Sequence, residues 1–271
     1  MTKVQSKTAL ARKLGVSRAS LYYKPKKPRA DEGLRDAILA LRDEHPCYGH
    51  RRMALFLGVN KKKVRRVMRK YKIHPKRTRG RPTKQGDLGK VASETPNLAK
   101  DLCPIQPHVL WAGDFTYLPW RGDFVYLATV MDLYTREVVG WHLGLRHTAD
   151  LVTRALTDAC ERTNGTPQIF HSDQGSEYTS GSYELLLTQL NIRQSHAKKS
   201  SPWENGYQES FYNQFKLELG ATNQYQELGQ LMEAVYRQIW YYNERRIHLA
   251  LKTTPQDFHK QKQALLGPTN P

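Results

Sequence analysis

The chain has 271 residues, of which 39% are hydrophobic and 10% aromatic, so it is long enough and apolar enough for a globular core. It has no apolar run of the roughly 18 residues that a membrane span needs and no apolar leader, which predicts no membrane partner and a cytoplasmic location. Its three cysteines are far apart, and His45, Cys47 and His50 lack a second ligand pair at finger spacing, so neither a disulfide framework nor a zinc site is expected.

The positive charge is concentrated in the first 100 residues. They carry 28 Lys and Arg against 7 Asp and Glu, a net charge of +21, whereas residues 101–271 carry 15 against 18, a net charge of −3. Cations that neutralise phosphates release condensed counterions, so this asymmetry is typical of a nucleic-acid-binding arm joined to a second domain. A solvated basic tail is the alternative.

Residues 1–28 have the pattern of a helix-turn-helix unit. In "TALARKLGVSRASLYY" the apolar residues fall at helical spacings on both sides of Gly15, and Ser17 is placed to cap a second helix. Arg18 follows this cap and is a candidate DNA contact.

Residues 29–75 repeat the pattern. In "HRRMALFLGVNKKKVRRVMRKYKI" Gly58 and Val59 form the turn and Asn60 can cap the next helix, whose apolar stripe ends at Tyr71. Such tandem units place helices in the major groove, although helical pairs with a glycine turn also occur as plain packing units. The candidate DNA-contacting residues here are Arg51, Arg52, Lys61, Lys62, Lys63, Arg65, Arg66 and Arg69.

Residues 76–107 are predicted to be a basic linker. The stretch "HPKRTRGRPTKQGDLGK" is rich in Gly and Pro and has no apolar period. It either follows a duplex or is a flexible tether.

The remaining chain predicts an α/β domain. "HVLWAGDFTYLPW", "DFVYLATVMDLYTR" and "EVVGWHLGL" are β-rich and separated by short polar breaks, which predicts an antiparallel meander. Helix, strand, helix, strand and helix patterns follow. We expect a ribonuclease-H-like core over residues 108–220, with a five-stranded mixed sheet and helices, and a C-terminal helical extension of it over 221–271. The all-α helix-turn-helix region precedes this core.

Three carboxylates are the candidate catalytic and metal-binding residues. Asp114 lies within the first predicted strand, Asp173 just past the fourth, and Glu209 on the helix after the fifth. The first and fourth strands are neighbours in such a sheet, so the three acids can converge. Hard divalent ions take oxygen ligands, and a cluster of this kind can hold two Mg²⁺ or Mn²⁺ ions about 4 Å apart.

The helix that carries Glu209 supports this assignment. Asn205 and Lys216 share its side with Glu209 at offsets of four and seven, and both are candidate DNA contacts. Tyr207, Phe211 and Phe215 are expected to form a separate core stripe.

Three further residues allow two interpretations each. Asp132 is either a neighbour of Asp114 or a hydrogen-bonding strand residue. His171 either orients Asp173 or is structural. Trp203 either stacks on a DNA base or holds its loop in place.

An ordered set of segments carries a family resemblance. "WAGDFTYL", "VMDLYTREVVGW", "HSDQGSEY", "SPWENGYQESFYNQFKLE" and "YYNERRIHLALKTTPQDF" resemble the catalytic core of DDE transposases of the insertion-sequence type encoded by two overlapping frames, which is similar to the retroviral integrase core. The 35 residues between Asp173 and Glu209 equal the interval of that family. The resemblance implies that Asp114, Asp173 and Glu209 are the catalytic triad.

The resemblance also implies the activity: binding of element ends, strand cleavage by water, and transfer of the freed 3′-hydroxyl through a circular intermediate. It implies double-stranded DNA partners, namely terminal repeats and target DNA, a homo-oligomer that is at least a dimer, and a prokaryotic, nucleoid-associated location. Two alternatives remain, a DNA-binding regulator with an inactive core and a structure-selective nuclease. The chain departs from the family pattern at Gly113, often threonine, and at Ile247, where relatives tend to have proline.

Overall fold

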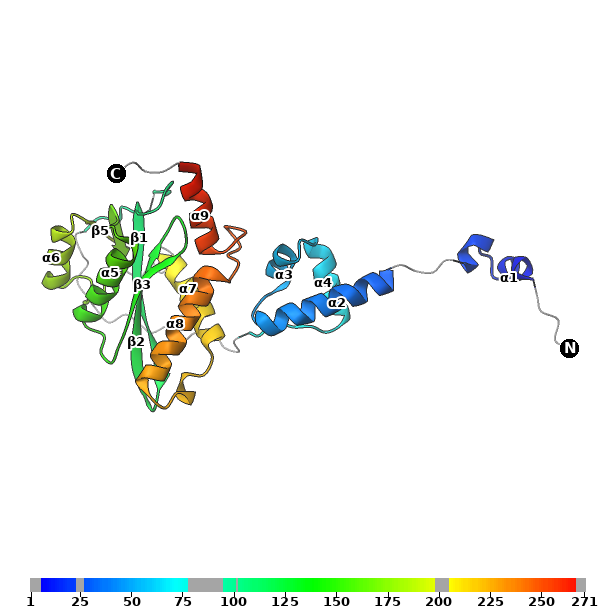
Figure 1. Ribbon diagram of the computed structural model, residues 1–271, viewed down its shortest axis with the longest axis horizontal. Coiled ribbons are helices and arrows are strands. Elements are labelled where there is room, and N and C mark those ends of the chain that lie inside the picture. The colour runs from blue at the N-terminus through cyan, green and yellow to red at the C-terminus, as the bar shows by residue number, and fades with distance from the viewer. Residues whose placement is uncertain (1–5, 23–26, 78–94, 101, 198–204, 267–271) are drawn as a thin grey trace. The chain divides into compact units, whose positions relative to one another are not determined.

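The computed structural model describes residues 6–22, 27–77, 95–100, 102–197 and 205–266. The chain divides into two compact units, residues 1–75 and 76–271 (Figure 1). Within the described ranges, no helix is long and apolar enough to cross a membrane.

The first helical pair is shorter than expected. Helix α1 spans Lys7–Lys13, and Gly15 turns the chain with φ +64°. Ser17 caps a single 3₁₀ turn, η1 (Arg18–Leu21), by accepting from Ser20 N at 3.2 Å. The second helix that the pattern predicted is therefore one turn long in the part of this pair that the structure describes.

The second helical group consists of α2 (Lys27–Glu44), α3 (His50–Phe56) and α4 (Lys61–Lys70). Gly58 has φ +61°, a left-handed conformation that glycine adopts without steric cost, and Asn60 Oδ1 caps α4 by accepting from Lys62 N at 2.8 Å. Val64, Val67 and Met68 are buried. The turn, the cap and the apolar stripe of α4 thus lie where the sequence predicted them.

A buried acid joins α2 to α4. The Asp31 carboxylate is almost inaccessible to water and accepts hydrogen bonds from both terminal nitrogens of Arg66, at 2.6 and 2.7 Å, and from Lys70 at 3.3 Å. The hydrogen bond from Arg66 is the main cause that lowers the pKa of Asp31 to about 2. Two cations of this basic helix therefore hold the unit together.

The second unit is built on a five-stranded sheet in the order β3-β2-β1-β4-β5. Its strands are β1 (Leu110–Trp120), β2 (Asp123–Asp132), β3 (Val138–Gly144), β4 (Ile169–Ser172) and β5 (Arg193–His196). The first three form the predicted antiparallel meander, while β4 pairs in parallel with β1 and β5 with β4. Arg121 and Gly122 both have positive φ, as a two-residue hairpin turn that matches strand twist requires. The predicted mixed sheet is confirmed.

Helices cover both faces of this sheet (Figure 1). One face packs on α5 (Ala149–Thr163) and α6 (Gly181–Gln189), the other on α7 (Gly206–Leu219) and α8 (Leu228–Glu244). The 3₁₀ turn η3 (Thr222–Gln224) follows α7, and α9 (Pro255–Leu266) follows α8. Because α8 contributes Leu231, Val235 and Ile239 to the same core as β1 and β2, it is an integral layer of the second unit.

Polar side chains fix α7 on the sheet. Gln208 is fully buried, and its Nε2 donates to Ala112 O at 2.6 Å while its Oε1 accepts from Thr129 at 3.2 Å. Tyr212 donates to Asp114 O at 2.6 Å, and its hydroxyl lies 2.8 Å from Thr129 Oγ1. These bonds set the position of α7 along β1 and its rotation about its own axis.

The predicted core stripe of α7 is wrong at one position. Phe211 and Phe215 are buried, but Tyr207 is 52% exposed. The rotation that buries Gln208 and Tyr212 turns Tyr207 away from the sheet. An apolar count along the helix cannot show this, because it treats glutamine as a surface residue.

We predict that Tyr212→Phe destabilises the fold. The substitution keeps the ring but leaves Asp114 O without its donor, which is expected to lower the free energy of unfolding by about 1–3 kcal/mol. Urea unfolding measures this change. The control, Tyr236→Phe, alters a half-exposed ring of α8 and should change stability by less than about 0.5 kcal/mol; equal effects from the two variants would contradict the anchoring role.

Helix α9 is attached through an ion pair. His259 Nδ1 lies 2.9 Å from Glu137 Oε2, and the rings of Phe258 and Tyr134 are in contact. The hydrogen bond with Glu137 raises the pKa of His259 above its usual value, although burial opposes this. His108 and Asp132 also face this pair, and burial lowers the pKa of His108.

The attachment of α9 is expected to weaken as the pH rises. Because the pKa of His259 is raised in the folded chain, its stabilising contribution is complete below the unfolded pKa of about 6.5 and is lost as the pH rises through the folded pKa. The free energies of unfolding of wild type and His259→Gln, measured in urea, should therefore differ most near pH 6 and progressively less toward about pH 9. A difference that stays constant, or grows with pH, would rule out the ion pair as its source.

Candidate active site

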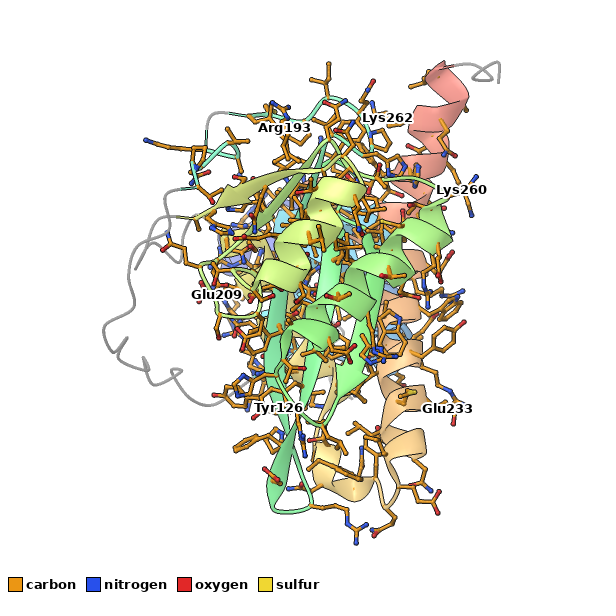
Figure 2. The ribbon with its side chains drawn as sticks, turned by 90° about the vertical axis from the view of Figure 1, so that its left-hand side faces the viewer. Tyr126, Arg193, Glu209, Glu233, Lys260 and Lys262 are labelled. Atoms are coloured by element: carbon orange, nitrogen blue, oxygen red, sulfur yellow. The ribbon has the colours of Figure 1, made fainter. Side chains whose placement is uncertain are left out.

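The three predicted acids come from three elements of the second unit. Asp114 is half-buried in the middle of β1, Asp173 is exposed directly after β4, and Glu209 is exposed in the first turn of α7. Strand β4 pairs with β1 only over Leu110–Ala112. Asp173 follows the end of β4 and therefore lies beside the part of β1 that comes after Ala112. In the view of Figure 2, Glu209 lies at a height between Arg193 above and Tyr126 below.

The other two acids influence Asp114 electrostatically. The pKa of Asp114 lies well above its usual value, first because the carboxyl is withdrawn from water and then because Asp173, and more weakly Glu209, face it. Lys216 opposes this shift. No three His, Cys, Asp or Glu side chains of the described ranges form a ready-made metal-binding group. The donors are nonetheless all oxygen atoms, and the repulsion at Asp114 is what a bound cation would relieve, so the residues fit a hard divalent ion.

The turn after β4 orients Asp173 through residues that sequence reasoning missed. Gly175 N donates to Asp173 Oδ1 at 2.9 Å, and a Cβ on Gly175 would lie only 3.0 Å from both Asp173 Oδ1 and Glu177 Oε2. Glu177 is buried and its carboxylate is 2.8 Å from Nδ1 of His147. In the sequence, the only indication of this arrangement is the segment "GSEY", in which Gly175 precedes the acid Glu177 by two residues. Nothing in the sequence points to His147.

The glycine before Asp114 has a packing reason. A Cβ at Gly113 would meet the Phe170 ring at 2.3 Å, closer than any real contact. The ring of Phe170 therefore occupies the space that a threonine would need. The departure from the family pattern is compensated within the fold and leaves Asp114 in its strand.

Lys216 and Asn205 differ in accessibility although both lie on the Glu209 side of α7. Lys216 is half-buried, and its ammonium lies 4.5 Å above the ring of Tyr117, which is 50% exposed. Burial lowers the pKa of Lys216, and Asp114 partly offsets this. Asn205 is buried at the start of α7, where its Oδ1 has no hydrogen-bond partner among the described residues.

The predicted DNA contacts of the first unit are mostly exposed. Arg52 is half-buried with its guanidinium above Tyr48, and Arg66 is engaged by Asp31. The exposed ones without a described acidic partner are Arg18, Arg51, Lys61, Lys62, Lys63, Arg65 and Arg69. Five of these belong to α4, so that helix carries the densest cationic surface of this unit.

Several other candidates are structural. The buried Asp132 carboxylate accepts from His108 N, Trp111 Nε1, Tyr134 N and Thr135 N, which fixes the turn after β2. His171 is buried with its Nδ1 2.9 Å from Ser195 Oγ. Arg246, the residue before the Ile247 departure from the family pattern, is buried, and its Nε lies 2.8 Å from Glu218 Oε1. Trp203 and residues 78–94 of the predicted linker lie outside the described residues.

Comparisons with known proteins agree with this architecture. Residues 104–202 match a family model described as an integrase core domain, and residues 190–255 match a second integrase core domain model. The transposase for insertion sequence element IS904 of Lactococcus lactis subsp. lactis (strain IL1403) is 32% identical over 251 residues, covering 89% of this chain and 99% of that protein. The putative transposase InsK for insertion sequence element IS150 of Escherichia coli (strain K12) is 31% identical over 268 residues, covering 93% of each.

Among solved structures, a chain of the simian T-cell lymphotropic virus intasome in complex with PP2A regulatory subunit B56 gamma superposes with a TM-score of 0.54. It is 18% identical and covers 86% of this chain and 75% of that chain, a likeness that shows the shared fold. The identity to full-length relatives, the integrase core and the sheet with its three acids lead to one conclusion: the chain belongs to the DDE transposases of insertion sequences, DNA transposases with a retroviral-integrase-like core.

Proposed function

We propose that this transposase binds the terminal repeats of its own element, cleaves a strand at each end and joins the freed 3′-hydroxyl to a second DNA site. The observation that best supports Asp114, Asp173 and Glu209 as the catalytic residues is their electrostatic coupling at Asp114. A carboxyl whose pKa is raised by burial and by neighbouring carboxylates, beside a lysine, is typical of a functional site.

The reaction needs no covalent link between protein and DNA. A water oxygen attacks the phosphorus at the element end, the P–O3′ bond breaks, and the 3′ oxygen takes up a proton. That 3′-hydroxyl then attacks a target phosphorus in line and displaces another 3′ oxygen, which takes up the proton. The first step thus hydrolyses one phosphoester bond, and the second exchanges one phosphoester bond for another.

Asp114, Asp173 and Glu209 are the residues that would hold the divalent ions, two Mg²⁺ or Mn²⁺ per site. When bound, such ions stabilise the charge that develops on the attacking and leaving oxygens. The chain's own contribution is positional: Gln208 and Tyr212 hold the first turn of α7 against β1, and the Gly175 amide orients Asp173. Lys216, beside Asp114, would neutralise a phosphate oxygen, and Asn205 would contact DNA after a rearrangement that exposes it.

The assembly that this function requires contains at least two copies, because two element ends must meet. A twofold-symmetric dimer on paired ends is the simplest arrangement. The chain would act in a prokaryotic cytoplasm on nucleoid DNA. The basic linker and both helical groups of the first unit would contribute DNA contacts outside the catalytic core.

Two other functions remain distinguishable by experiment. A DNA-binding regulator with an inactive core would bind ends without nicking them, and a structure-selective nuclease would cut branched DNA without joining. A strand-transfer assay with labelled element ends separates these outcomes. Metal-dependent joining is the result expected here.

Two neighbouring arginines of α4 should affect DNA binding differently. Arg65 is exposed without a described acidic partner, whereas Arg66 is held by Asp31. If Arg65 contacts a phosphate, Arg65→Gln should reduce the slope of log affinity against log salt by about 1. Arg66→Gln should change the slope less but lower the resistance of the first unit to urea, because Asp31 keeps only Lys70. Equal slope changes in fluorescence anisotropy titrations would show that Asp31 does not withhold Arg66 from DNA.

Glu209→Gln should separate binding from catalysis. The amide keeps the size of the side chain on an exposed position, so the fold should survive, but a neutral oxygen is a poorer ligand for a hard cation. We expect normal gel shifts with end-containing DNA and a loss of nicking and joining of at least about a hundredfold. Glu233→Gln, an exposed glutamate of α8, is the control. Near-native joining by a folded Glu209→Gln protein would remove Glu209 from the triad.

A further inference from the structure

A cavity of about 580 Å³ lies in the second unit beside the first turn of α7. Its walls come from the segment that precedes β1, the turn between β2 and β3, the start of α7 and the residues after α8. The polar and aromatic groups that line it are Asn97, Lys100, Tyr134, Arg136 and Tyr207. None of these residues takes part in the catalytic cluster described above.

Arg136 supplies an unused donor to this cavity. Its guanidinium lies 3.8 Å from the ring centre of Tyr207, and its Nη1 is buried without a hydrogen-bond partner in the described parts of the chain. A buried charged donor without an acceptor is unfavourable, so the site is incomplete as it stands. Arg136 also has φ +63°, a backbone conformation that glycine adopts more easily than a residue with a side chain. The arginine at this position is therefore accommodated in an unfavourable backbone conformation.

The charge of the cavity selects the sign of its ligand. Its described lining contains two cations, Lys100 and Arg136, and no Asp or Glu. The nearest acid in sequence, Glu137, lies 2.9 Å from His259 and is engaged there. An oxyanion is therefore the group that would satisfy Arg136, and a phosphate is an anion whose oxygens match the planar fork of a guanidinium.

The size of the cavity and its aromatic wall further restrict the class of ligand that can bind there. A volume of about 580 Å³ lies in the range of pockets for small molecules and cofactors and does not admit a duplex. Tyr207 is 52% exposed, so one part of its ring remains open beside the part that Arg136 covers. An open tyrosine ring can stack on an unpaired base of any sequence.

We propose that this cavity binds one unpaired nucleotide of the DNA strand near the scissile phosphate, with its phosphate on Arg136 and its base on Tyr207. Tyr207 and Glu209 belong to the same first turn of α7 but point to opposite sides of it, so the strand would cross the start of the helix between the cavity and the acids. The inference rests on the proposed function, because it takes the DNA to lie across Glu209. The cavity would hold the strand out of the duplex beside the acids.

Equilibrium dialysis with the full chain tests the phosphate contact. The probes are 5′-phosphorylated thymidine dinucleotide and the same dinucleotide with a neutral methylphosphonate linkage and no 5′-phosphate. Loss of one charge-assisted hydrogen bond should weaken binding of the charged probe to Arg136→Gln by about tenfold. Arg121→Gln, which alters an arginine over Trp120 at the far end of β1, should leave it unchanged. Equal affinity of wild type for both probes, or equal losses in both variants, would overturn the proposal.

Photocrosslinking tests the base contact and keeps the proposal falsifiable if Arg136→Gln does not fold. A single-stranded oligothymidine with one 5-iodouracil should crosslink to Tyr207 in wild type, lose that crosslink in Tyr207→Ala and retain it in Tyr207→Phe. Crosslinks confined to residues 1–75 would overturn the base contact. Strand transfer by wild type is measured separately: an active protein without these signals refutes the cavity assignment alone, while an inactive one refutes the proposed function.

Discussion

The hydrogen bonds that hold α7 on the sheet are the constraint on which the site depends. Glu209 is exposed and has no described ion-pair partner, so nothing at its own side chain fixes its place. Its position follows from its neighbours one residue before and three residues after, Gln208 and Tyr212, which bind the backbone carbonyls of Ala112 and Asp114. Since buried polar groups without partners are costly, any slide of α7 along β1 would break several bonds at once. The helix thus keeps Glu209 in register with Asp114.

The other two acids are also positioned mainly by the backbone around them. Asp114 is held by its strand, and Asp173 by the end of β4 and the Gly175 amide. Among the described residues, Asp114 and Glu209 form no ion pair with a basic side chain, and Lys216, the cation that affects the pKa of Asp114, lies over Tyr117 instead. A paired carboxylate would be a poorer cation ligand. Asp114 and Glu209 therefore keep their oxygen atoms available to a cation in a chain that carries a formal charge of +18.

In the first unit the fold itself divides the basic residues into two roles. The buried Asp31 carboxylate pairs with the partly exposed Arg66 and Lys70, and these cations stabilise the packing of α2 on α4. The cations on the other positions of α4 have no such partner in the described structure and remain available to phosphate. Net charge alone does not distinguish these roles, because both sets of residues alternate along one helix.

Much of this protein was determined by its sequence. The order of strands and helices, the Arg121-Gly122 hairpin, the Asn60 cap and the apolar stripe of α4 all follow from local periodicity and turn chemistry, and the structure has them where the pattern placed them. These features depend on residues close in the chain, so a linear pattern is enough to predict them. The three acids were found in the same way, with the family spacing as support.

Only the tertiary structure decided which side chains support the acids. Gln208, which the sequence analysis did not single out, is buried. Tyr207 was expected in the core and is exposed, and Asp132 proved to be the centre of a turn rather than a neighbour of the site. Glu177 and His147, thirty residues apart, meet beside Asp173. The reason is physical: a buried polar group is stable only where its partners are, and those partners come from strands distant in sequence whose positions are set by the packing of the whole sheet.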